Sequence, residues 1–190
     1  MAKNLCYTSN YCRIVRPRSF LILILLCASI FYVSGCATKS VARPKGFPEG
    51  VLDGKQSSEF VTLVNSQMAN EFVEIGTAGM GRSLHGNLTQ WTDSAIELLR
   101  EKLTESGVTV TDKSSKTISL TITDAKMSTT AGGWGFKCAV TLRVEYAEVI
   151  REKFVGERGG WKYIDVCDAG IAEAVANLLR DEKMQRYLGY

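Results

Sequence analysis

Alternation of apolar and polar residues predicts a sheet as the main element of this chain. The longest alternation runs from Phe136 to Tyr146, where every second residue is apolar or aromatic. A shorter one runs from Ile118 to Thr123, and residues 60–64 and 71–75 also fit strands. A period of two places one face of a strand on a core and the other in solvent. A short strand is expected at 108–111, and residues 148–156 should return antiparallel to the longest strand.

Two segments have helical spacing instead. Apolar residues recur every three or four positions at 90–106 and at 165–180, and the tail 181–190 fits a short helical turn. Thr89 is the expected cap of the first helix, and Gly107 is its stop. Helices separated by runs of strands predict an α+β fold. We expect an antiparallel or mixed sheet of about five to six strands, with the two main helices packed on one face.

The N-terminal region has the pattern of a targeting segment. Phe20–Tyr32 is a run of 13 apolar or small residues, and the preceding stretch carries four basic residues and no acidic one. A spanning helix needs about 20 apolar residues, so the length favours a signal peptide. An uncleaved anchor is the alternative, because extending the run through Cys36 and Ala37 gives about 18 residues, which can just span.

The apolar run ends in Val33-Ser34-Gly35-Cys36, which resembles the lipobox of bacterial lipoproteins. The resemblance implies cleavage before Cys36, a diacylglycerol on its thiol, and an amide-linked acyl chain such as palmitate. Ala37, where an inner-membrane retention signal has Asp, implies the outer membrane. Residues 1–35 are then a lipoprotein signal peptide, 36–58 a lipidated N-terminus and flexible tether, and 59–190 a single periplasm-facing domain.

Removal of the signal peptide changes the charge balance. The full chain has 23 basic and 20 acidic residues, for a net charge of +3. Residues 36–190 retain 19 basic and 20 acidic residues, for a net charge of −1. The basic excess belongs to the targeting segment, so it predicts no nucleic-acid partner.

Of the six cysteines, only Cys138 and Cys167 remain besides Cys36 once residues 1–35 are removed. An even pair in an oxidising compartment favours a disulfide. Cys138 is predicted on the inward face of a strand, and Cys167 on the inward face of the helix that covers it. Two buried free thiols are the alternative.

Candidate chemistry is sparse. The glycines of 76–81 do not match a phosphate-binding loop, and the next helix begins too late to hold the same phosphate. His85 is the only histidine, and no paired-ligand spacing surrounds it. Asp165 and Asp168 lie where they suit the start of a helix. The sequence therefore predicts no catalytic residue, metal or cofactor, and a protein that is not an enzyme.

Aromatic residues in glycine-rich turns give the one candidate contact surface. Trp134 lies in a glycine turn, and Trp161 and Tyr163 follow Gly159-Gly160. Aromatic side chains anchor protein interfaces and stack on sugar rings. The alternative is that they close the ends of the sheet.

Four stretches resemble the small, YajG-like outer-membrane lipoproteins of Gram-negative bacteria: 79–83, 86–93, 138–146 and 167–170. The resemblance implies an α+β lipoprotein without known catalysis. It predicts a lipid-anchored binding or accessory protein of the cell envelope that holds a protein, glycan or lipid partner. The alternatives are an assembly factor for an outer-membrane barrel or transport complex, and an envelope hydrolase.

Overall fold

The computed structural model describes residues 38–68, 72–78, 82–130, 135–147 and 150–190. The chain divides into two units, Met1–Gly35 and Cys36–Tyr190. Every element described below belongs to the second unit.

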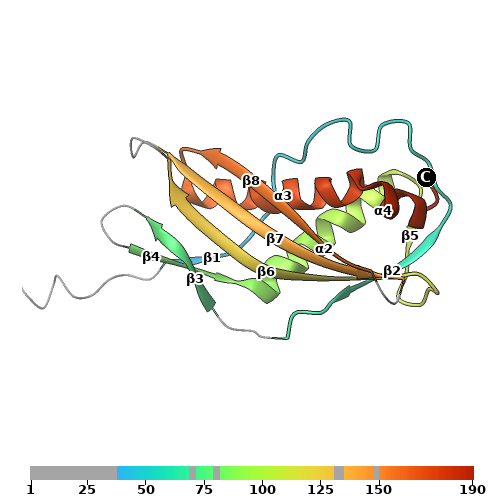
Figure 1. Ribbon diagram of the computed structural model, residues 1–190, viewed down its shortest axis with the longest axis horizontal. Helices are drawn as coiled ribbons and strands as arrows, with labels where there is room; N and C mark the ends of the chain where they lie inside the picture. Colours follow the sequence, from blue (N-terminus) through green and yellow to red (C-terminus); the bar gives the residue numbers. More distant parts are fainter. Residues whose placement is uncertain (1–37, 69–71, 79–81, 131–134, 148–149) are drawn as a thin grey trace, which may run out of the picture. The chain divides into compact units, whose positions relative to one another are not determined.

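A five-stranded mixed sheet, in the order β5-β2-β6-β7-β8, forms the body of the domain (Figure 1). Its strands are β2 (Phe60–Asn65), β5 (Thr109–Val110), β6 (Thr117–Thr129), β7 (Phe136–Tyr146) and β8 (Ile150–Gly160). The strand β2 runs parallel to both β5 and β6, whereas β6, β7 and β8 form an antiparallel meander. The predicted α+β class and mixed sheet are confirmed.

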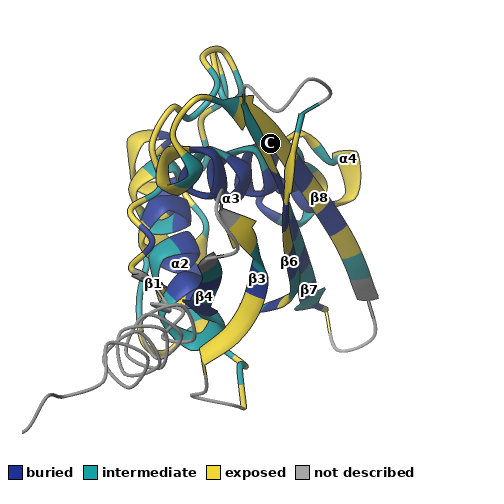
Figure 2. Ribbon diagram, turned by 90° about the vertical axis from the view of Figure 1, so that its left-hand side faces the viewer, coloured by how far each residue is buried: buried dark blue, intermediate teal, exposed yellow. Residues whose placement is uncertain are grey.

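Two long helices, α2 (Leu88–Glu105) and α3 (Tyr163–Arg180), cover one face of this sheet, and the short α4 (Glu182–Tyr187) follows α3. Figure 2 shows the buried residues gathered between these helices and the strands. The alternation in β7 explains this, since Cys138, Val140, Leu142 and Val144 are all buried on the face toward the helices. Both helices lie where their spacing predicts them.

A second, three-stranded sheet was not predicted. It has the order β1-β4-β3, with β1 (Thr38–Ser40) parallel to β4 (Arg82–Asn87) and β3 (Phe72–Ala78) antiparallel to it. Gly86 of β4 lies against the buried ring of Trp91, where an added Cβ would be 2.8 Å from the nearest ring carbon. This contact joins the second sheet to the first turn of α2.

The segment expected to be a flexible tether instead packs on the domain from Thr38 onward. The side chain of Ala42 is buried, and Phe47, Val51 and Leu52 pack against the core. Its backbone is also held, because Ser94 Oγ donates to the Ala42 carbonyl at 3.0 Å. The folded region therefore extends at least about twenty residues upstream of the expected Glu59.

The start of α2 also differs from the prediction. Asn87, rather than Thr89, is the N-cap, and its side-chain oxygen accepts a hydrogen bond from the Gln90 N–H at 3.0 Å. One turn later, buried Thr92 accepts from the Ile122 N–H at 3.1 Å. The register of β6 against β7 shifts just after Ile122. Thr92 thus satisfies a buried backbone donor there and fixes α2 over β6.

Candidate contact surface

The disulfide between Cys138 and Cys167 fixes α3 on the sheet. The S–S distance is 2.16 Å, and the two Cα atoms, one in β7 and one in α3, are 5.0 Å apart. Both residues are buried. The predicted pairing is confirmed, and the bond holds the first turns of α3 against the middle strands.

A contact between glycines lies beside the disulfide. A Cβ added at Gly156 of β8 would stand 2.0 Å from the Gly170 carbonyl oxygen and 2.3 Å from the Ala174 backbone nitrogen. Only a residue without a side chain allows the backbones of β8 and α3 to approach so closely. Together with the disulfide, this contact sets the position of the β8–α3 junction.

That junction carries the exposed aromatic surface. Trp161, between β8 and α3, is 77% exposed, and Ile164 in the first turn of α3 is 41% exposed. Tyr163 is half-buried and meets Phe136 edge-on, with ring centroids 6.0 Å apart and an interplanar angle of 79°. Residues 161–165 line a shallow pocket of about 300 Å³. Of the predicted surface, Trp161 is exposed, Tyr163 packs against the core, and Trp134 lies outside the described residues.

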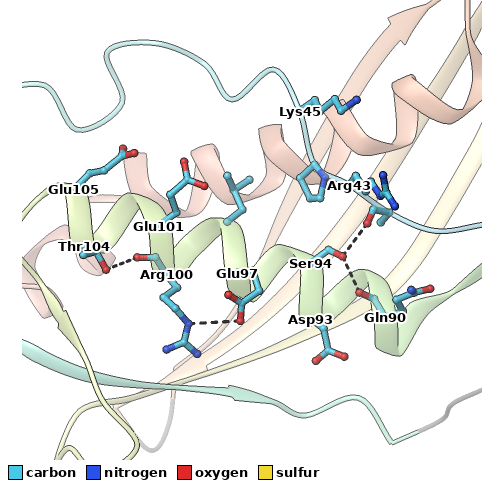
Figure 3. Close-up of a pocket in the computed structure, with 13 residues that line it drawn as sticks. Arg43, Lys45, Gln90, Asp93, Ser94, Glu97, Arg100, Glu101, Thr104 and Glu105 are labelled. Carbon is cyan, nitrogen blue, oxygen red and sulfur yellow. Dashed lines mark hydrogen bonds and ion pairs between the residues drawn. The ribbon is translucent and has the colours of Figure 1, made fainter.

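A second hollow follows the exposed side of α2 and was not predicted (Figure 3). It has a volume of about 840 Å³ and lies between α2 and residues 42–45. Sequence reasoning missed it because it exists only where the supposed tether packs on the helix. Its lining includes four carboxylates of α2: Asp93, Glu97, Glu101 and Glu105.

These carboxylates are already paired. Asp93 accepts a hydrogen bond from Asn65 Nδ2 at 2.6 Å, and Glu97 pairs with Arg100 at 3.6 Å. Lys102 bonds both Glu101 and Glu105, and these two contacts raise the pKa of its ammonium while partial burial opposes them. The four α2 carboxylates that line the groove thus each bond to a neighbouring side chain.

Asp168 has a different role from the predicted one. The N-cap of α3 is Lys162, which makes no side-chain cap bond, while Asp165 lies in the first turn. Asp168 is buried, at 4% exposure, and its Oδ1 accepts the Arg43 backbone N–H at 2.9 Å. Burial raises the pKa of this carboxyl, and the Arg43 hydrogen bond opposes that shift. Asp168 therefore fastens the N-terminal segment to α3 instead of capping the helix.

His85 lies in the middle of β4, in register with Glu74 of β3 and Lys39 of β1. Among the residues that the structure describes, no group of three or more His, Cys, Asp or Glu side chains is placed to hold a metal ion. In the same residues, no helix is long and apolar enough to cross a membrane. Cys36, the predicted lipidation site, lies outside the described residues.

Comparison with known proteins gives only distant likenesses. No protein-family model and no curated protein matches the chain. Among solved structures, a PelC dodecamer from Paraburkholderia phytofirmans shares 15% identity over 77% of this chain and 95% of that one, with a TM-score of 0.34. A hypothetical protein from Chlamydia trachomatis shares 10% identity over 70% of this chain and 98% of that one, with a TM-score of 0.41. The rare lipoprotein B of Shewanella oneidensis shares 14% identity over 69% of this chain and 92% of that one, with a TM-score of 0.33. None of these structures is similar enough to assign the chain a family or an activity.

Proposed function

We propose that this protein is a lipid-anchored lipoprotein of a Gram-negative outer membrane. Its domain faces the periplasm and acts as a non-catalytic binding or accessory protein for a protein, glycan or lipid of the envelope. The observation that carries the proposal is the lipobox-like Val33-Ser34-Gly35-Cys36, placed directly after a 13-residue apolar run.

The division of the chain supports this proposal. The boundary between its two units falls between Gly35 and Cys36, which is the bond that lipoprotein processing would cleave. Cleavage there would leave the Cys36–Tyr190 unit whole. A signal peptide is expected to be separable from the domain it exports in this way.

The disulfide supports the compartment. Cys138 and Cys167 are the two cysteines left after removal of the signal peptide and lipidation of Cys36, and they are bonded to each other. Disulfides persist in the oxidising periplasm and are rare in the reducing cytoplasm. The pairing also leaves no thiol in the exported domain other than the one that would carry lipid.

The exposed surface at Trp161 and Ile164 supports a binding role. Both side chains stay exposed beside a rigidly held junction, and interface hot spots are rich in tryptophan. The carboxylates of the α2 groove pair with neighbouring side chains, so that groove is a weaker candidate for recognition.

The intact mass of the protein extracted from the membrane fraction tests the proposal. We expect a mass equal to residues 36–190 plus a diacylglyceryl group and one amide-linked acyl chain. Cys36→Ser should remain an unprocessed precursor, whereas Cys27→Ser, in the same N-terminal segment, should mature normally. A wild-type mass equal to all 190 residues would contradict the lipoprotein assignment.

A further inference from the structure

The segment around Ala42 and Arg43 is held to the start of α3. The Arg43 N–H bonds to Asp168 in the second turn of α3 at 2.9 Å, and the preceding Ala42 carbonyl accepts from Ser94 in α2 at 3.0 Å. In Figure 1, β1, the end of β8 and the start of α3 lie at the same end of the domain. The N-terminal strand therefore enters the domain at the end that carries the exposed Trp161.

Chain length limits how far this surface can lie from a lipid on Cys36. Arg43 is seven residues after Cys36, a reach of at most about 25 Å. Along α3, Asp168 is only about 8 Å from Tyr163, the first residue of the helix, which lies two residues after Trp161. The junction cannot move far from a bilayer that holds the lipid, because Arg43 is hydrogen-bonded to the same helix.

The chemistry of the junction fits a bilayer surface. Trp161 is 77% exposed and is followed by exposed Lys162 and by Ile164 at 41% exposure. Tryptophan concentrates at the level of lipid headgroups, and lysine favours the anionic phosphates there. Arg43 and Lys45 lie close enough to Asp168 on α3 to interact with its charge, so they add positive charge near this end.

Resting on the proposed lipoprotein function, we propose that the Trp161–Ile164 surface docks into the headgroup region of the bilayer that holds the lipid on Cys36. The acyl chains supply most of the membrane affinity, since more than one chain makes an anchor stable. The docked side chains fix the orientation of the domain. The opposite end of the sheet, where β2 begins, then points into the periplasm and remains available to a partner.

Quenching of tryptophan fluorescence by brominated lipid tests this docking. The lipidated protein is reconstituted into vesicles of phosphatidylethanolamine and phosphatidylglycerol, with and without brominated acyl chains. Every protein carries Trp134→Phe, which removes the third tryptophan of the chain. In this background we expect brominated lipid to lower the emission, and Trp161→Phe to abolish that loss. Buried Trp91 is then the one tryptophan common to both proteins and serves as internal background.

A matched control moves the exposed tryptophan to the other end of the sheet. Phe60 is 57% exposed, and the strand pairings place it beyond the Thr117 end of β6, whereas Phe136 and Gly160 lie at the Thr129 end. About 40 Å of strand separates those two ends. In the same Trp134→Phe background, Trp161→Phe combined with Phe60→Trp keeps the amino-acid composition, and its emission should not respond to brominated lipid.

Two results would overturn the docking, and they can be told apart. Equal quenching with and without Trp161→Phe in the Trp134→Phe background, in a sample whose mass shows lipidated Cys36, would contradict the docking and leave the lipoprotein assignment intact. That result would favour a protein partner for the surface. A mass without lipid would contradict both proposals, since the docking depends on the anchor.

Discussion

Reduction of the Cys138–Cys167 disulfide is expected to lower the free energy of unfolding by about 3.6 kcal/mol. The two cysteines are 29 residues apart in sequence. In the chain-entropy model, releasing a loop of that length returns about 12 cal/mol/K to the unfolded chain, which gives this value at 25 °C. The native state should change little, because both cysteines are buried between β7 and α3 and remain small apolar side chains as thiols.

Urea denaturation of the detergent-extracted protein, with and without a reductant, measures this difference. In thermal unfolding of the same samples, each kcal/mol moves the melting temperature of a domain of this size by about 2–4 °C, so reduction should lower it by roughly 7–14 °C. The double variant Cys138→Ala, Cys167→Ala is the control. Its stability should be low and should not respond to reductant.

Unfolding of the wild type at the same urea concentration in both conditions, while thiol titration shows that the bond has been reduced, would refute the expected loss of stability. Such a result would mean that packing of α3 alone restricts the chain as strongly as the covalent link. A lower stability of the double variant in the presence of reductant would show instead that reductant acts elsewhere in the molecule.

Three further predictions concern single residues, each measured by urea denaturation. Gly156→Ala should cost roughly 1–3 kcal/mol because its Cβ would overlap the backbone of α3, while Gly159→Ala on the same strand, with its nearest contact at 3.6 Å, should cost clearly less. Asn87→Ala should cost about 1 kcal/mol through loss of the α2 cap; an unchanged midpoint would argue against that cap. Burial raises the pKa of Asp168 above its ordinary value, so the folded state retains a proton that the unfolded state releases, and stability should fall as pH rises from about 4 through that raised pKa. Asp168→Asn keeps an acceptor for the Arg43 N–H and should remove this fall; a wild-type pH profile that matches the variant would refute the assignment.

Elements whose burial repeats locally could be read from the sequence. In β7 every second side chain is buried, so a period of two indicates which face of the strand lies on the core and that Cys138 is on that face. In α3, Cys167 lies one turn before Ile171 on the same apolar stripe. The disulfide was predictable because the apolar period of the strand and that of the helix each indicated which of their faces is buried.

Elements that depend on distant partners could not be read in this way. The strand β4, with the sequence Arg-Ser-Leu-His-Gly-Asn, has a single large apolar residue, Leu84, and becomes a strand only because β3 and β1 pair with its two edges. Residues 42–45 have no apolar period, yet Asp168 and Ser94 hold their backbone through side chains far away in sequence. Such contacts leave no local signal, since one polar side chain satisfies one remote backbone group.

The position of α3 links the fold to the proposed docking. The disulfide, the Gly156 contact and the Asp168 hydrogen bond all act on the first three turns of this helix, directly after Trp161. The disulfide and the Gly156 contact fix the helix to the sheet, and the Asp168 hydrogen bond fixes the segment around Arg43 to the helix. Under the proposed docking, the angle between domain and membrane is therefore set by the fold itself rather than by a free linker. The tilt of the domain should then depend on Trp161, Asp168 and the disulfide, whereas its attachment to the membrane should depend mainly on Cys36.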